Sequence, residues 1–154
     1  DSFITNQTGI ACAVRTADCV PLLMCDPQQR VVAAVHAGWR GTAQNIALKT
    51  LQKMCAQYGC KPENILVAIG PSICGDCYEV GPEVAEAMQQ LGYQNKSQTH
   101  LDVADVNRFT LLQAGVQPAN IDIIKLCTKC SGKLLASFRR DGSTARQVSF
   151  IFLK

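Results

Sequence analysis

The sequence lacks the features that place a protein in a membrane or on a nucleic acid. No apolar run approaches the roughly 20 residues that a membrane-spanning helix needs. The net charge is only +3, and the lysines and arginines are scattered, with no basic run and no interleaved aromatic residues. We therefore expect no membrane and no nucleic acid as a partner.

The beginning of the chain, DSFITNQTG, lacks an initiating methionine and the charged and apolar regions of a signal peptide. We expect that the chain starts after processing or is a piece of a longer protein. Nine cysteines are many for 154 residues, and their odd number without a secretion signal favours reduced thiols, some of them metal ligands, over a disulfide framework. This cysteine usage predicts a cytoplasmic location.

The apolar pattern predicts one α+β domain over residues 1–154. Helical spacing predicts helices over 42–58, with Thr42 as the N-cap and Gly59 at the end, over 82–91 and over 105–114. The expected strands are 9–25 with a polar break at 15–19, then 31–36, 64–69, 121–126, and 134–139 paired with 148–153 around a turn at 141–143. Because several strands look hairpin-linked, we expect mixed, largely antiparallel sheets.

Two residues that can carry chemistry lie at the edges of neighbouring expected strands. Cys19 precedes the apolar run 20–25, and His36 ends the run VVAAVH at 31–36, which we expect to pair with it as a hairpin. A thiolate and an imidazole brought together in this way form either a Cys–His nucleophile pair or part of a zinc site. The alternative is that both are ordinary core residues.

Charged residues near this pair are candidates for binding substrate. Arg40 follows the glycine-rich turn after His36, which is a common arrangement for holding a phosphate or a carboxylate. Asp18 precedes Cys19 and could orient His36, hold a substrate hydroxyl or cap a turn. Arg139 and Arg140 point to opposite faces of an expected strand, so at most one lines a given pocket, and for Arg140 we favour a solvated turn with an Arg–Asp pair.

Two CxxC pairs are present, Cys74 with Cys77 and Cys127 with Cys130. Two such pairs can hold a structural zinc with four thiolates. Their separation is far longer than the roughly 15–20 residues of a compact zinc ribbon, so a disulfide or simple burial is favoured over a four-cysteine zinc site. Cys127 is also a candidate catalytic residue, because it ends an expected strand beside Thr128.

Several short motifs occur in the order that they have in one bacterial enzyme family. They are TADC (16–19), HAGWRG (36–41), GPSI (70–73), CYEV (77–80), LD (101–102) with Asn107, CT (127–128) and SFRRDG (137–142). Nearly end to end, the sequence resembles the multicopper polyphenol oxidase (laccase-like) family, also called the purine nucleoside phosphorylase or peptidoglycan editing factor family. One departure is Ala145, in Thr-Ala-Arg at 144–146, where the family commonly has Thr-Gly-Arg.

The resemblance implies a layered α/β/β/α sandwich and a zinc ion held by two histidines and one cysteine. Cys19 and His36 match the cysteine and the second histidine, and the first histidine belongs to a motif upstream of this chain. The chain therefore looks like the C-terminal two-thirds of the family domain. The candidate site residues are Cys19 and His36 for the metal, Arg40, Asp18 and Cys127 for catalysis, and Arg40, Arg139 and Trp39 for substrate.

The resemblance also implies a zinc enzyme that phosphorolyses adenosine, inosine, guanosine and methylthioadenosine and deaminates adenosine. A second interpretation is copper-dependent oxidation of phenols, although the chain has two histidines and conventional multicopper sites need many. A third is a Cys–His hydrolase that edits muropeptide precursors, with Cys19 as nucleophile and His36 as base. Loss of activity on metal removal would separate the zinc interpretations from the hydrolase.

Overall fold

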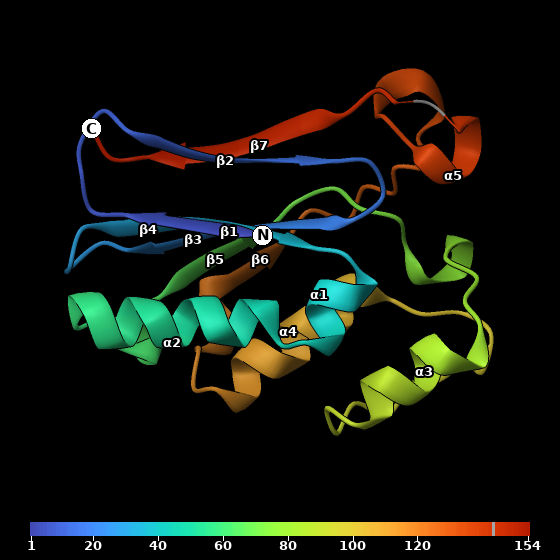
Figure 1. The fold of residues 1–154 in the computed structure, drawn as a ribbon, viewed down its shortest axis with the longest axis horizontal. Coiled ribbons are helices and arrows are strands. Elements are labelled where there is room, and N and C mark those ends of the chain that lie inside the picture. Colours follow the sequence, from blue (N-terminus) through green and yellow to red (C-terminus); the bar gives the residue numbers. More distant parts are fainter. Residues whose placement is uncertain (143) are drawn as a thin grey trace.

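Two β-sheets face each other, and helices cover the outer side of the larger sheet (Figure 1). The computed structural model describes residues 1–142 and 144–154. The larger sheet contains β1 (Ser2–Thr5), β4 (Val31–Ala37), β3 (Val20–Asp26), β5 (Leu66–Ile69) and β6 (Ile121–Ile123), in that spatial order, and the smaller sheet pairs β2 (Ala11–Thr16) with β7 (Gln147–Phe152). The helices are α1 (Trp39–Ala43), α2 (Ile46–Tyr58), α3 (Pro82–Gln89), α4 (Val103–Gln113) and α5 (Phe138–Asp141). Among the described residues, no helix combines the length and apolar character needed to span a bilayer.

The strand β4 is buried on both faces, because it lies between the helices and the smaller sheet. Ala33 and Val35 belong to the main core, which the helices also line. Ala34 points the other way and packs with Cys12 and Val14 of β2. A strand covered on both sides has no polar face, which explains the uninterrupted apolar run before His36.

The expected hairpin is present. The strands β3 and β4 pair antiparallel, with Val20 opposite Ala37. Their turn is closed by Asp26, whose Oδ1 accepts hydrogen bonds from the backbone N–H groups of Gln28 at 2.9 Å and Gln29 at 3.0 Å. The strand β5 is antiparallel to β3, and β6 is parallel to β5. The predicted α+β class with mixed, largely antiparallel sheets is therefore confirmed.

The helix expected over 42–58 is in fact two helices. The first, α1, ends at Ala43, and α2 begins at Ile46 after Asn45, which adopts a left-handed backbone conformation with φ of 59°. Thr42 is therefore not an N-cap. It is buried within α1, and its backbone N–H donates to the carbonyl of Gly38 at 2.9 Å.

The prediction of a strand over 134–139 is wrong. This segment contains the start of α5, where the Oγ of Ser137 caps the helix by accepting a hydrogen bond from the N–H of Arg140 at 3.1 Å. The strand β7 pairs with β2 instead. Gly142 ends α5 with φ of 61°, and Ser143, which we expected in a turn, lies outside the described residues.

Candidate functional site

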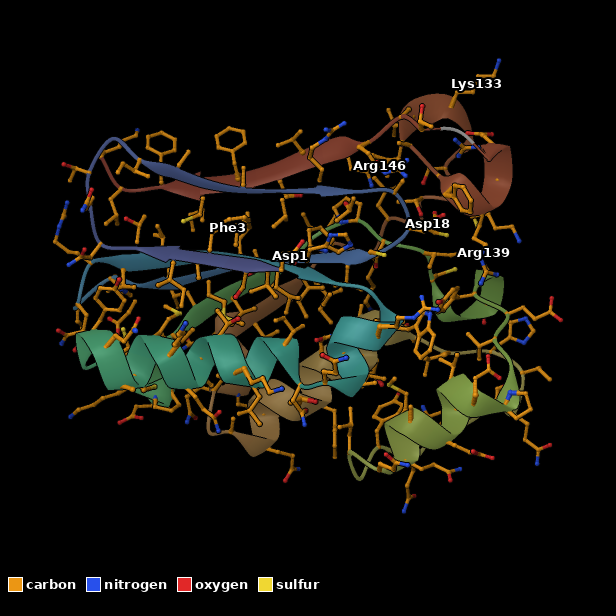
Figure 2. All side chains as sticks on the ribbon, viewed as in Figure 1. Asp1, Phe3, Asp18, Lys133, Arg139 and Arg146 are labelled. Carbon is orange, nitrogen blue, oxygen red and sulfur yellow. The ribbon has the colours of Figure 1, made fainter. Side chains whose placement is uncertain are left out.

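A cavity of about 320 Å³ brings together segments that are far apart in the sequence. Its walls come from β2, the loop before β3, the end of β4, α1, α5 and the segment before β7. The lining residues are Arg15, Ala17, Asp18, Cys19, His36, Ala37, Gly38, Trp39, Ile73, Tyr78, Val103, Phe138, Arg139 and Arg146. Figure 2 shows Asp18, Arg139 and Arg146 at the same end of the molecule, where α5 lies.

The structure brings Cys19 and His36 into this one cavity. Cys19 comes immediately before β3, and His36 lies on β4 opposite Pro21. Burial raises the pKa of the Cys19 thiol, the carboxylate of Asp18 adds to this effect, and the charge of Arg146 opposes it. Burial lowers the pKa of His36, so its imidazole stays neutral at neutral pH. Both shifts favour the neutral forms of the imidazole and the thiol.

Three arginines line the same cavity. Arg139 is held by the backbone carbonyl of Glu79, to which its Nη1 donates at 3.1 Å, and its guanidinium lies 4.8 Å from the ring centre of Tyr78. Arg146 is close enough for its charge to lower the pKa of both Cys19 and His36. Of the three, Arg15 and Arg146 were not among the candidates from the sequence. The Thr-Ala-Arg motif was the available signal for Arg146.

Trp39 lines the cavity, but the neighbouring Arg40 does not. Arg40 is exposed, and its guanidinium lies 4.5 Å from the ring centre of Trp39. The expectation that Arg40 faces the pocket is therefore corrected. Arg40 is the second residue of α1, and its exposed side chain lies outside the cavity lining.

Asp18 is 7% exposed and has both carboxylate oxygens engaged by the protein. Its Oδ1 accepts a hydrogen bond from the hydroxyl of Thr128 at 2.6 Å, and its Oδ2 accepts one from the backbone N–H of Arg139 at 2.7 Å. Neither of these hydrogen bonds involves His36. Its φ of 82° is in the left-handed region, which aspartate tolerates better than most residues. These contacts tie the loop before β3 to two distant segments.

Cys127 lies apart from the Cys19 cavity, in a group with the three other cysteines of the CxxC pairs. The Sγ atoms of Cys74, Cys77, Cys127 and Cys130 all lie within 4.8 Å of one another, and all four are free thiols. Burial alone would raise the pKa of Cys127, but hydrogen bonds from the backbone N–H groups of Cys74 and Cys130 lower it to about 7. The two CxxC pairs, for which the sequence favours a disulfide or simple burial over a metal site, thus form a cluster of four free thiols that could hold a metal ion.

Arg140 does pair with an aspartate, as expected. Its Nε donates to Oδ1 of Asp141 at 2.8 Å. It also donates to the backbone carbonyls of Thr128 at 2.7 Å and Leu135 at 2.8 Å, which fixes α5 to the segment after β6. Arg140 therefore has a structural role outside the cavity.

Comparison with known proteins agrees with this geometry. The family described as multi-copper polyphenol oxidoreductase laccase matches residues 1–154. A protein named adenosine deaminase RL5, from an unknown prokaryotic organism, is 39% identical over 100% of the chain and 62% of its own length. Purine nucleoside phosphorylase YlmD of Bacillus subtilis (strain 168) is 36% identical over 100% of the chain and 59% of its own length. The chain thus spans less than two thirds of these relatives.

Solved structures share the fold. The hypothetical protein YfiH of Bacillus licheniformis is 35% identical and superposes with a TM-score of 0.94 over 100% of the chain and 61% of that protein. YlmD of Geobacillus stearothermophilus, also 35% identical, superposes with a TM-score of 0.92 over 99% of the chain and 60% of that protein. The chain therefore belongs to the multi-copper polyphenol oxidoreductase laccase family.

Proposed function

We propose that the protein is a zinc-dependent purine nucleoside phosphorylase that also deaminates adenosine, with adenosine, inosine, guanosine and methylthioadenosine as substrates. The observation that carries this proposal is the convergence of Cys19, His36 and the arginines Arg139 and Arg146 on one cavity. This combination offers metal ligands and anion-binding groups side by side. The names of two relatives, adenosine deaminase and purine nucleoside phosphorylase, support the same pair of reactions.

The chemistry of Cys19 and His36 fits a zinc ion. Thiolate and imidazole are donors that zinc prefers, and the lowered pKa of His36 keeps its imidazole available for coordination. Catalytic zinc sites use three protein ligands, so we expect the upstream histidine implied by the family resemblance to be the third. When bound, zinc supplies Lewis-acid activation of a water molecule at neutral pH. In this assignment Cys19 is a ligand and not a nucleophile.

The arginines are suited to the phosphate that phosphorolysis requires. A guanidinium group binds phosphate through two parallel hydrogen bonds. Arg146 acts electrostatically on both Cys19 and His36, so an anion on Arg146 would lie close to the zinc ligands. Positive charge develops on the sugar as its bond to the base breaks, and a phosphate held by Arg146 and Arg139 would stabilise that charge.

The aromatic residues of the cavity can receive the base. Trp39 and Tyr78 line the cavity and offer flat apolar faces to a purine ring. Arg139 lies over one face of Tyr78, as Arg40 does over one face of Trp39, so a purine would stack on the other face of either ring. Arg40 lies over Trp39 outside the cavity lining, so we assign it a supporting role at the rim and no direct contact with the reacting bond.

The test is chromatography of the products formed when the intact, zinc-loaded protein is incubated with adenosine, with and without phosphate. We expect adenine only when phosphate is present, and inosine in either case, with part of the inosine converted to hypoxanthine when phosphate is present. His36→Ala and Cys19→Ala should abolish both products. His100→Ala and Cys25→Ala are the matched controls, because these residues do not line the cavity, and they should leave both products unchanged.

Absence of both products from zinc-loaded protein would overturn the proposal. The same preparation should then be tested for hydrolysis of muropeptide precursors, which the Cys–His hydrolase interpretation requires even after metal removal. Copper-loaded protein should be tested with a phenolic substrate in parallel. Oxidation of the phenol by that sample, without any nucleoside product from the zinc form, would favour the oxidase interpretation.

A further inference from the structure

The four-cysteine cluster lies outside the cavity assigned to nucleoside chemistry. We propose that Cys74, Cys77, Cys127 and Cys130 bind one structural zinc ion, separate from the metal site of Cys19 and His36. A metal-binding site brings together the ligand atoms of several cysteine, histidine or acidic side chains. Among the described residues, these four cysteines are the group of three or more that does so. This assignment goes beyond the proposed enzymatic activity and does not depend on it.

The spacing of the sulfur atoms fits a single tetrahedral ion. With Zn–S bonds of about 2.3 Å, tetrahedral geometry places each pair of sulfurs about 3.8 Å apart. The four Sγ atoms lie within 4.8 Å of one another, and the Cys77 and Cys130 sulfurs are 3.0 Å apart. Side-chain adjustments of less than about an ångström would therefore complete the tetrahedron. A four-iron cluster, in which each cysteine binds a different iron, needs wider sulfur spacing.

The fold explains how two CxxC pairs so distant in sequence meet. The strands β5 and β6 are parallel neighbours, so their carboxyl ends lie at the same edge of the sheet. Pairing continues past the strands as a bridge between Ser72 and Cys127, with the N–H of Thr128 donating to the carbonyl of Ser72 at 3.1 Å. Each CxxC pair follows directly. The spacing rule for compact zinc ribbons does not apply, because here two parallel strands, and not one short ribbon, bring the CxxC pairs together.

Backbone donors surround the sulfur of Cys127. The N–H groups of Cys74 and Cys130 both donate to it at 3.4 Å. Such N–H···S hydrogen bonds orient a thiolate and reduce the repulsion that four negative sulfurs create around one divalent ion. Thiolates favour soft and borderline ions over calcium or magnesium, and four protein ligands leave no open position for substrate. The site is therefore structural in character.

Zinc at this cluster would stabilise one wall of the nucleoside cavity. The N–H of Tyr78 donates to the carbonyl of Cys74 at 3.0 Å, and the N–H of Ile73 donates to the carbonyl of Asp18 at 3.0 Å. Both Tyr78 and Ile73 line the cavity. On the other side, Thr128 follows Cys127 and donates to the carboxylate of Asp18. Binding of the ion would hold these contacts together and add its binding free energy to the folded state.

The test measures zinc per chain in the intact protein, purified under reducing conditions, by elemental analysis. We expect Cys77→Ser combined with Cys130→Ser to lose one zinc per chain relative to the wild type. His36→Ala should keep that zinc, because its ligands are elsewhere. Cys12→Ser combined with Cys25→Ser is the matched control, since neither residue belongs to the cluster, and it should keep the wild-type content.

A second measurement needs no variant and remains informative if the serine variants fold poorly. The wild-type protein is alkylated with and without prior removal of zinc by a chelator, and the modified cysteines are identified by mass spectrometry. Protection of all four cluster cysteines that disappears on chelation supports the site. Equal alkylation in both samples, a disulfide among the four, or unchanged zinc content in the cluster variant would overturn it. These outcomes are independent of nucleoside turnover.

Discussion

At the scale of single residues, Gly38 packs closely against the thiol of Cys19. A Cβ on Gly38 would lie 3.0 Å from the Sγ of Cys19, which is tighter than ordinary van der Waals contact. Glycine at 38 therefore allows the backbone to approach the thiol that we assign to the metal. A methyl group there would push Cys19 away from its position beside His36.

We predict that Gly38→Ala lowers zinc affinity at the Cys19 site and kcat/KM for adenosine by about tenfold to a hundredfold, as small displacements of metal ligands do. Zinc titration and steady-state kinetics measure the two effects. Gly41→Ala is the control from the same motif, because its Cβ would meet the side chain of Ile46 at an ordinary 3.4 Å. Equal values for both variants would contradict the assigned role of Gly38.

A second residue-scale prediction concerns the buried thiol of Cys60. Burial, together with the neighbouring Asp26 carboxylate, raises its pKa from 9.0 to about 12. Between these pH values the folded state keeps a proton that the unfolded state loses. The free energy of unfolding should therefore fall as the pH rises from about 9 toward 12. Cys60→Ala removes this contribution.

Urea unfolding of the wild type and Cys60→Ala at about pH 8 and about pH 10 tests this prediction. We expect the stability of the wild type to fall more between the two pH values than that of the variant. Taking the difference between the stability changes of the two proteins cancels the titration of the groups that they share, such as tyrosines and lysines. Parallel pH profiles for the two proteins would contradict the raised pKa of Cys60.

At the scale of elements, α1 and α4 are joined by a buried hydrogen bond. The Nδ2 of Asn107 donates to the Oγ1 of Thr42 at 2.9 Å and to the carbonyl of Val103 at 2.8 Å. Asn107 belongs to the motif that the family resemblance uses, yet it does not line the cavity. Its position indicates that it holds α1, which carries Trp39, against α4.

We predict that Thr42→Val lowers the free energy of unfolding by about 1–2 kcal/mol, because the Asn107 amide loses a buried acceptor. A double-mutant cycle with Asn107→Ala should give a coupling energy of about 1 kcal/mol between the two residues. Chemical denaturation of the four proteins supplies the values. A coupling energy indistinguishable from zero would mean that the contact does not join the helices energetically.

The elements that the sequence predicted well are those whose signals are local. The β3–β4 hairpin follows from two adjacent apolar runs and a turn that Asp26 caps within its own segment. The strand β1 was missed, because its short sequence SFIT becomes a strand only through pairing with β4. The strand expected over 134–139 failed because the Ser137 cap outweighs an apolar alternation. Asn45 was a readable signal for the break between α1 and α2, since asparagine tolerates left-handed backbone.

The residues of the candidate site divide in the same way, into those with a local sequence signal and those without one. Cys19 and His36 were found because one hairpin carries both. Arg15 and Arg146 were missed, because Arg15 reaches the cavity from β2 and Arg146 from the segment before β7. No local sequence pattern shows how this smaller sheet packs on β4. The sequence separation of the two CxxC pairs argues against a four-cysteine cluster, and the cluster forms all the same because the parallel pairing of β5 and β6 brings its two halves together.

At the scale of the whole molecule, Asp18 is where three distant segments meet. Its carboxylate binds Thr128 after β6 and the start of α5 at Arg139, and its carbonyl accepts from Ile73 after β5. Asp18 lines the cavity, and its partners Thr128 and Ile73 are the sequence neighbours of Cys127 and Cys74 in the cysteine cluster. Since both carboxylate oxygens are already engaged, Asp18 is better suited to positioning the site than to exchanging protons with a substrate.

This reasoning predicts different outcomes for two substitutions of Asp18. Asp18→Ala removes both acceptors from buried donors and should lower the free energy of unfolding by about 2–4 kcal/mol, with a parallel loss of activity. Asp18→Asn keeps one acceptor oxygen and tolerates the φ of 82°, so it should lose less stability and retain most of kcat. Denaturation curves and the separate values of kcat and KM test both variants. If Asp18→Asn folds as stably as the wild type but loses kcat by a hundredfold or more, Asp18 acts in catalysis, as its place among the candidate catalytic residues of the sequence proposes, and does more than position the site.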